Sequence, residues 1–330
     1  IKKLKFNKAP GPDGIQIECY KALSKEQLQP ILDLFNRWFD GEEIPKEVTQ
    51  AMVILLYKKG DKTNLENYRP ISLLNTHYKL LTAIIQKRIS TALDKHLQST
   101  QYGFREKKGT AQAIHYIRRV IEKGESTQTQ TLLVLLDWEK AFDKVKHEKL
   151  FEALERMGVP EKILKRIKQL YKQPTFKIEM EGRQSEWTAQ QTGIRQGCPL
   201  SPYLFIILMT CLAHDVHAED RTKTIRQRLQ GMKVDEVLYA DDTICVTQDE
   251  RAMERLLEVI ETEGSYYGLK LNRGKCEYLS FGPTMPVHFP DGTPVPSKHE
   301  VKYLGCNLND KGDPGKEVSR RIKNMHGNTK

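Results

Sequence analysis

Val237-Leu238-Tyr239-Ala240-Asp241-Asp242-Thr243-Ile244-Cys245-Val246 places two adjacent carboxylates between two apolar runs. Strand-forming residues flank the tetrapeptide 239–242 on both sides, which predicts a β-hairpin that carries the aspartates at a tight turn, at the edge of a sheet. Neighbouring carboxylates repel each other, and a divalent cation that neutralises both removes that cost. Asp-Asp also occurs in ordinary solvated turns, so this stretch decides the fold only together with a second acidic site.

The second acidic site is Asp137, which ends the apolar run Leu132-Leu133-Val134-Leu135-Leu136. A continuous run of this kind predicts a buried central strand whose carboxylate emerges at the tip, although Asp137 could instead cap the following turn. With the hairpin, it supplies the third carboxylate of a two-metal phosphoryl-transfer site. In such a site, two Mg²⁺ ions about 4 Å apart activate the attacking hydroxyl and stabilise the leaving oxygen.

Periodicity and turn residues predict the other elements. The predicted strands cover 51–57, 175–180 and a segment near 68–71; the predicted helices cover 25–39, 78–97, 111–123, 149–157, 160–171, 200–214 and 250–267. Ser24 or Lys25 begins the first helix, Thr110 is expected to cap the helix over 111–123, and Gly268 ends the last one.

Further short motifs follow one another in a fixed order around the acidic sites. They are Lys8–Ile15, Asn67–Asn75, Gln101–Arg105, Asp137–Asp143, Gly193–Pro202, Tyr239–Asp242, Gly268–Asn272 with Lys275, and Lys302–Gly305. In this order and over nearly the whole chain, they resemble the reverse transcriptase domain of a non-LTR (LINE-like) retrotransposon.

The resemblance implies an α+β fold, the right-hand polymerase, with fingers and palm present, the thumb truncated and an antiparallel palm sheet packed on helices. It places the fingers at 1–130, a first part of the palm at 131–172, a return through fingers and palm at 173–199, and the rest of the palm at 200–298. The primer grip and the start of the thumb are expected at 299–330.

The implied activity is RNA-directed DNA synthesis by nucleotidyl transfer from a dNTP to a primer 3′-hydroxyl. Asp137, Asp241 and Asp242 would hold two Mg²⁺ ions, with Mn²⁺ as an alternative, and Lys275 would protonate the leaving pyrophosphate. A lysine beside a developing phosphate charge suits that task, although Lys275 could also be an ordinary surface lysine.

The nucleotide would be bound by Lys59, Arg69, Phe142, Gln196 and Gly197. A basic hairpin tip suits a triphosphate, because guanidinium forks onto phosphate oxygens and ammonium adds a point charge, but either cation could simply be solvated. In the family, the Phe142 position packs where a 2′-hydroxyl would lie and so rejects ribonucleotides. Composition alone would leave this residue as a core aromatic.

Template and primer contacts are expected from six residues. They are Gly103, Arg105, Tyr239, Tyr303, Leu304 and Gly305. Glycine beside aromatic and basic side chains permits the close approach of a base and its phosphate. The expected partners are therefore an RNA template, a DNA primer or nicked target DNA, and dNTP.

Charge and cysteine usage agree with these partners. The net charge is +10, and the basic excess is concentrated in residues 1–130, as expected for a surface that grips phosphates. Six scattered cysteines without a CxxC pair argue against a disulfide framework and favour an intracellular protein. Cys211, His214 and His217 could share one helix face, but no fourth zinc ligand with familiar spacing is near.

No membrane partner is expected, since the longest apolar run, Tyr203–Leu212, is too short to span a bilayer. A retroelement that primes on chromosomal DNA would act in the nucleus, which is an inference from the family. Two alternatives stay open: a reverse transcriptase/maturase of the group II intron type, and a non-catalytic RNA-binding remnant of a retroelement.

Overall fold

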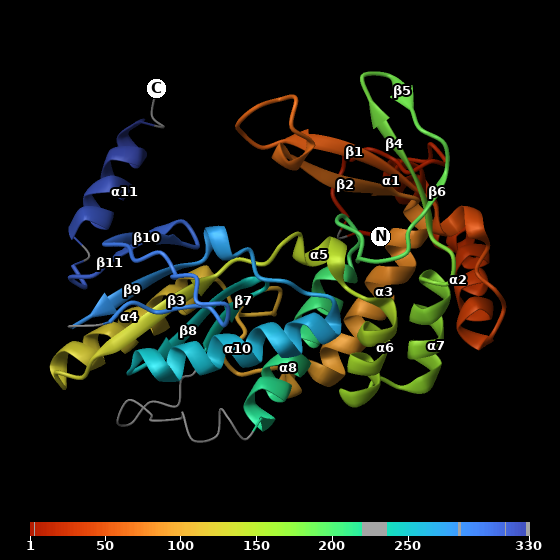
Figure 1. Cartoon of the computed structure of the whole chain (residues 1–330). Coiled ribbons are helices and arrows are strands. Elements are labelled where there is room, and N and C mark those ends of the chain that lie inside the picture. Colours follow the sequence, from red (N-terminus) through yellow and green to blue (C-terminus); the bar gives the residue numbers. More distant parts are fainter. Residues whose placement is uncertain (3, 220–235, 283–284, 314, 328–330) are drawn as a thin grey trace. The chain divides into compact units, whose positions relative to one another are not determined.

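The computed structural model describes residues 1–2, 4–219, 236–282, 285–313 and 315–327 (Figure 1). The chain forms two compact units, each built from two stretches of sequence. The first unit is Ile1–His96 with Phe142–Leu208, and the second is Leu97–Ala141 with Met209–Lys330. These units are defined by contacts, whereas the fingers and palm boundaries predicted above are functional, so those boundaries stay a prediction.

The first unit combines helices with a mixed sheet. Its helices are α1 (Ile17–Ala22), α2 (Lys25–Asp40), α3 (Thr76–Leu93), α5 (Ala141–Lys144), α6 (His147–Arg156), α7 (Glu161–Leu170) and the first half of α8 (Ser201–Ala218), with short 3₁₀ turns at Lys46–Thr49, Leu65–Asn67 and Asp94–His96. Its strands are β1 (Ala51–Tyr57), β2 (Tyr68–Leu74), β4 (Thr175–Met180), β5 (Arg183–Gln184) and β6 (Thr188–Ala189).

Strand β1 forms the centre of the sheet in the first unit. It pairs antiparallel with β2 and parallel with β4, and β5 and β6 pair with β4. The strands predicted over 51–57 and 175–180 are confirmed. Strand β2 extends to Leu74 although it contains Pro70, because β2 lies at the edge of the sheet, where a missing N–H is tolerated.

Helices of the first unit agree with the predictions in type and differ at their ends. Helix α2 begins at Lys25, and Ser24 forms a reciprocal capping box with Gln27. Helix α3 begins earlier than predicted, at Thr76, and its last turn tightens into the 3₁₀ turn Asp94–His96. Tightening of this kind is common at helix ends because it satisfies the final carbonyls.

The second unit contains an antiparallel sheet covered on both faces. Its helices are α4 (Thr110–Ser126), the second half of α8, α10 (Glu250–Tyr267) and α11 (Gly315–Gly327), with a 3₁₀ turn at Arg273–Lys275. Its strands are β3 (Thr131–Leu136), β7 (Glu236–Tyr239), β8 (Asp242–Thr247), β9 (Glu277–Phe281), β10 (Glu300–Tyr303) and β11 (Cys306–Asn309).

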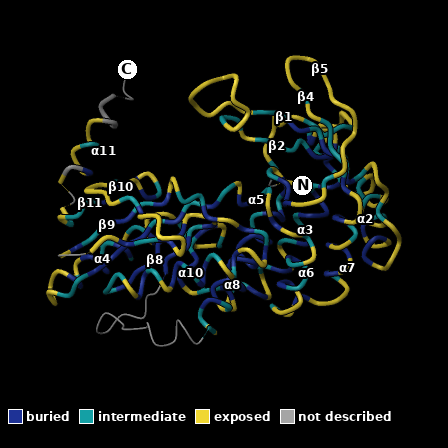
Figure 2. Tube along the Cα trace, in the orientation of Figure 1, coloured by how far each residue is buried: buried dark blue, intermediate teal, exposed yellow. Residues whose placement is uncertain are grey.

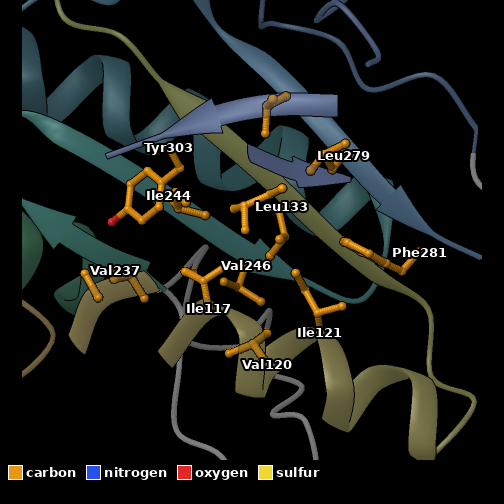
Figure 3. Close-up of a cluster of buried hydrophobic side chains, with 13 residues drawn as sticks. Ile117, Val120, Ile121, Leu133, Val237, Ile244, Val246, Leu279, Phe281 and Tyr303 are labelled. Atoms are coloured by element: carbon orange, nitrogen blue, oxygen red, sulfur yellow. The ribbon is translucent and has the colours of Figure 1, made fainter. Parts of the chain in front are cut away.

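Strand β3 is interior in the antiparallel order β7-β8-β3-β9. On one face, α4 and the β10–β11 hairpin form a core with Leu133, and Figure 3 shows the α4 side chains Ile117, Val120 and Ile121 within it. On the other face, Leu136 lies beside side chains of α8 and α10. Burial from both sides explains why the run over 132–136 is apolar without alternation.

Two helix boundaries in the second unit differ from the predictions. Thr110 is the first residue of α4 and Gly109 is its N-cap, so the predicted cap is wrong. The Gly109 N–H donates to the side-chain oxygen of Gln112 at 2.7 Å, so the side chain that caps this helix start belongs to the third helical residue and not to the N-cap residue. Helix α8 continues to Ala218, and His217 in its last turn pairs with Glu236 at 2.7 Å.

No helix among the described residues is both long and apolar enough to cross a lipid bilayer.

Candidate active site

The paired aspartates lie at the turn between β7 and β8. Tyr239 and Asp242 are register partners, so the hairpin has a two-residue turn, Ala240-Asp241. Ala240 has φ +59, a left-handed conformation at the first turn position, where type II′ hairpins usually place glycine. The predicted hairpin with two aspartates at its tip is therefore confirmed.

Asp137 lies on the neighbouring strand at the same end of the sheet. Leu136 pairs with Thr243, so the next residue of β3's chain, Asp137, and the preceding residue of β8, Asp242, lie at the same end of this antiparallel pair. Both turn aspartates are exposed to solvent. Partial burial nevertheless raises the pKa of Asp242 from 3.8 to about 6, and the charges of Asp241 and Asp137 add to the shift. The three carboxylates therefore interact electrostatically at one edge of the second unit.

The segment that carries Lys275 is anchored beside Asp137. The Asn272 N–H donates to the Asp137 carbonyl at 2.8 Å, and the Asp137 N–H donates to Cys276 Sγ at 3.5 Å. Lys275 is exposed in the 3₁₀ turn between these two contacts. The second unit thus brings Lys275 onto the segment next to the carboxylates, and its role as an acid stays a prediction.

Gly103 and Arg105 have contacts within the second unit that the sequence did not reveal. Gly103 is buried against the Ala240-Asp241 turn, where a Cβ would lie 2.4 Å from the Ala240 nitrogen. The Arg105 guanidinium donates to the carbonyls of Gln98 and Gln101 at 3.0 and 3.2 Å. Their predicted contacts with template stay predictions. Gln101, in the motif 101–105, had no predicted role, and its side-chain oxygen accepts from the Ala240 N–H of this turn at 3.0 Å.

The β10–β11 hairpin presents the residues predicted to grip the primer. Leu304 and Gly305 form its two-residue turn, with φ +48 and +79, the pattern of a type I′ turn. Tyr303 is 3% exposed, and its ring lies in the core in Figure 3. Burial raises the pKa of Tyr303, and the charge of Asp242 adds to the shift. Tyr239 is half-buried. Contacts with primer stay a prediction for all four.

The predicted triphosphate-binding cations lie on the β1–β2 hairpin of the first unit. Figure 2 shows the connecting loop as exposed, and both Lys59 and Arg69 are exposed residues. Arg69 is the register partner of Leu56, one pair from the connecting loop. The hairpin predicted from the basic turn is confirmed, and the binding of triphosphate by its cations stays a prediction.

The glycine-containing loop over 193–199 is joined to β2. The Ser72 N–H donates to the Gln196 carbonyl at 2.7 Å. Gly197 has φ +114, and a Cβ there would lie 2.5 Å from the Ser72 oxygen. Only glycine fits both the conformation and the space. The strand that carries Arg69 and the loop that carries Gln196 are therefore fixed to one another.

Phe142 is attached to the same loop. The Ile194 N–H donates to the Phe142 carbonyl at 2.7 Å, and the Phe142 ring stacks on Phe205 with centroids 4.6 Å apart. The ring is thereby held in one orientation and remains half-buried. The first unit gathers Arg69, Gln196, Gly197 and Phe142, whereas the carboxylates belong to the second unit.

Arg195 is a residue of interest that the sequence analysis passed over. It is 3% exposed, and its guanidinium lies 5.4 Å from the Tyr78 ring centroid. Neither of its terminal nitrogens has a hydrogen-bond partner among the described residues. A buried cation is costly unless an aromatic face or polar groups compensate it. Its position inside the 193–199 motif was visible in the sequence, but its burial was not.

The oxygen chemistry of the three aspartates suits Mg²⁺, which prefers carboxylate ligands. Among the described residues, however, no group of three or more acidic, histidine or cysteine side chains is gathered closely enough to ligate one ion. The aspartates share one edge of the sheet, and their side chains would have to turn toward a common point to hold a metal.

Comparisons with known proteins identify relatives of the chain. It is 26% identical to the RNA-directed DNA polymerase from mobile element jockey of Drosophila melanogaster, over 94% of this chain and 34% of that protein. It is 28% identical to the Transposon TX1 uncharacterized 149 kDa protein of Xenopus laevis, over 93% of this chain and 24% of that protein. The chain thus spans about a third or less of the length of these relatives.

Solved structures with the same fold include the apo telomerase of Candida tropicalis truncated from its C-terminal domain. That chain superposes with a TM-score of 0.54 at 14% identity, covering 89% of this chain and 59% of the telomerase chain. This likeness shows the fold alone, the right-hand polymerase, as predicted. The model of the family described as reverse transcriptase (RNA-dependent DNA polymerase) matches residues 57–308. This match covers more than half of the sequence, and the chain belongs to that family.

Proposed function

We propose that this chain catalyses RNA-directed DNA synthesis as the polymerase part of a non-LTR retroelement protein. The observation that carries the proposal is the pairing of Leu136 with Thr243, which brings the ends of β3 and β8 that carry Asp137 and Asp242 to one end of the β7-β8-β3-β9 sheet, beside Asp241. Three interacting carboxylates at the tips of adjacent strands suit the binding of two divalent cations.

Asp137, Asp241 and Asp242 would hold the metal ions, for which we propose Mg²⁺. When bound, the ions lower the pKa of the attacking hydroxyl and neutralise charge on the phosphates. The primer 3′-hydroxyl loses its proton to solvent, and its oxygen forms a bond to the α-phosphorus of the dNTP while the bond from that phosphorus to the bridging oxygen breaks. Pyrophosphate leaves, and Lys275 supplies its proton.

The first unit would bind the nucleotide. Arg69 and Lys59 are exposed residues of the β1–β2 hairpin, so both side chains can approach a triphosphate from solvent. Phe142, fixed by its stacking on Phe205, would exclude a ribose 2′-hydroxyl. Most of the catalysis would come from positioning the primer and the nucleotide and from neutralising charge.

The experiment is extension of a DNA primer on an RNA template in Mg²⁺, with dNTPs and rNTPs offered separately. We expect extension with dNTPs, and its loss in Asp241→Asn with primer–template affinity preserved. Asp33→Asn, on the exposed face of α2, is the matched control and should leave extension unchanged. Undiminished extension by Asp241→Asn, or tight RNA binding by the native chain with no extension, would contradict the proposal.

A further inference from the structure

A short segment of the second unit lies along the outer edge of β7, the strand that leads to the aspartates. The Leu238 N–H donates to the Thr100 carbonyl at 3.0 Å, and the Tyr102 N–H donates to the Leu238 carbonyl at 2.8 Å. These bonds form a parallel bridge centred on Gln101 and Leu238. We call residues 100–103 the bracing segment. It provides hydrogen-bond partners for the N–H and carbonyl of Leu238 on the edge strand β7, two residues before the Ala240-Asp241 turn.

The Gln101 side chain extends this contact to the turn itself. The residue is fully buried, and its carboxamide oxygen accepts from the Ala240 N–H at 3.0 Å and from the Gly103 N–H at 2.8 Å. One oxygen therefore joins the bracing segment to the residue that immediately precedes Asp241. Ala240 itself is buried, so its N–H would be costly to leave without a partner.

The bracing segment is held firmly enough to position the turn. Gly103 leaves no room for a side chain against Ala240, with a Cβ placed 2.4 Å from the Ala240 nitrogen. Behind the segment, Arg105 Nη1 and Lys108 Nζ donate to the Gln101 carbonyl at 3.2 and 3.3 Å. Lys108 also donates to the Ser99 carbonyl at 2.7 Å. Two cations and a close backbone contact therefore fix the position of Gln101.

We propose that Gln101 is a positioning residue of the polymerase site. Its carboxamide oxygen sets the orientation of the Ala240 peptide, and this orientation determines where Asp241 and Asp242 point. Ala240 has a left-handed φ of +59, a conformation that a non-glycine residue adopts only when its surroundings impose it. Gln101 provides that constraint. The catalytic consequence rests on the proposed function, whereas the contact with the turn does not.

Two substitutions separate the hydrogen bond from the bulk of the side chain. Gln101→Met keeps the length of the chain and removes the acceptor, and Gln101→Glu keeps an acceptor oxygen. We expect Gln101→Met to lower kcat by tenfold or more with the KM for dNTP changed less than threefold, and Gln101→Glu to restore part of kcat. Gln130→Met is the matched control, because it also loses one side-chain hydrogen bond, the one that Gln130 donates to Glu250. Gln130 directly precedes β3 and so lies at the opposite end of that strand from Asp137.

Hydrogen–deuterium exchange of residues 236–247 tests the contact without any catalysis. In Gln101→Met, the turn amides should exchange at least fivefold faster, while the amides of α2 and α10 keep their native rates. If the native chain lacks polymerase activity but Gln101→Met still speeds exchange at the turn, the proposed function is contradicted. The contact between Gln101 and the turn is then still supported. Unchanged exchange at the turn, kcat within twofold of native, or an equal loss in Gln130→Met would overturn the assignment of Gln101.

Discussion

Gly197 and Ser72 approach so closely that a Cβ on Gly197 would lie 2.5 Å from the Ser72 carbonyl oxygen. The neighbouring Gln196 carbonyl accepts the Ser72 N–H at 2.7 Å, so the loop and β2 are joined through two adjacent residues. Because of this contact, the loop that we expect to border the nucleotide cannot shift without moving β2.

Gly197→Ala should therefore damage nucleotide binding. The added methyl group displaces the loop from β2, and we expect the KM for dNTP to rise at least tenfold and the free energy of unfolding to fall by about 1–3 kcal/mol. Gly158→Ala is the control, since Gly158 also has a positive φ, +75, but has no atom within 4 Å of the added Cβ. Steady-state kinetics and urea unfolding measure both quantities, and similar kinetics for the two variants would refute the explanation.

Phe142 should determine the choice between deoxyribose and ribose. Replacing it with Val removes the ring but leaves the backbone bond to Ile194, so folding should be largely preserved. We expect the ratio of kcat/KM for dNTP to that for rNTP to fall by tenfold or more, because the gain comes from rNTP incorporation. Phe142→Tyr retains the ring and should retain the discrimination. If Phe142→Val discriminates as well as the native chain, the ring does not act as the steric gate.

Ionised Asp242 should cost stability in the absence of metal. The pKa of Asp242 is raised to about 6 in the folded chain, above its ordinary 3.8, so ionised Asp242 destabilises the fold at neutral pH. The cost is absent below pH 3.8, where the carboxyl is protonated in both states, and is fully present above pH 6.

Asp242→Asn should accordingly raise the unfolding midpoint in EDTA at pH 7.5. The difference from the native chain should shrink as the pH falls from 6 to about 4. Differential scanning calorimetry over this range measures it, with Asp33→Asn as the control for loss of an exposed acid. A midpoint that is lowered by Asp242→Asn at pH 7.5 would show that the carboxylate makes stabilising contacts instead.

Glu317 has the opposite electrostatic setting. Hydrogen bonds from Arg320 and Arg321 and from the Asn307 N–H lower its pKa to about 2, and its side chain is 5% exposed. Because the folded-state pKa is depressed, the stabilisation that ionised Glu317 contributes is fully present above pH 4.5 and is lost as the pH falls toward 2. Glu317→Gln should loosen α11 and β11 at neutral pH by about 1–3 kcal/mol in local opening free energy.

Hydrogen–deuterium exchange of 306–323 at pH 7 measures that loosening. Glu300→Gln is the matched control. It removes the charge from a neighbouring acid that accepts an exposed bond from the Asn307 side chain at 3.0 Å. Equal exchange in the two variants would mean that Glu317, which accepts the Asn307 N–H of β11, contributes nothing to the attachment of α11.

The features that could be predicted from the sequence are those with local signals. The β7–β8 hairpin was predicted because both of its strands are apolar and its turn lies between them, and Asp137 was recognised because it ends an unbroken apolar run. The parallel pairing of β1 with β4 could not be predicted, since Ala51 meets Phe176 only through tertiary structure. No short-range pattern encodes that partner.

The supporting contacts of the site were missed for the same physical reason. Gln101 is a polar residue in a loop, and nothing in its neighbours shows that it is fully buried below the turn. From the sequence alone, Arg195 would be assigned as a surface cation, and only the structure shows that it is buried against Tyr78. The cap of α4 was assigned to Thr110 because threonine commonly caps helices, whereas the bond is made by the Gly109 backbone, which carries no side-chain signal.

Each unit is assembled from two stretches separated by the other unit's residues, and this order has a consequence for synthesis on the ribosome. The β1–β2 hairpin emerges long before β4, and β3 long before β8, so the first half of each sheet must wait for its partner. Pairings this distant in sequence close slowly and expose unpaired strand edges meanwhile. A nascent chain that ends before α8 would therefore contain every strand of the first unit's sheet but only β3 of the β7-β8-β3-β9 sheet. It would carry β3 with both edges unpaired and depend on chaperones until the rest of the second unit arrives.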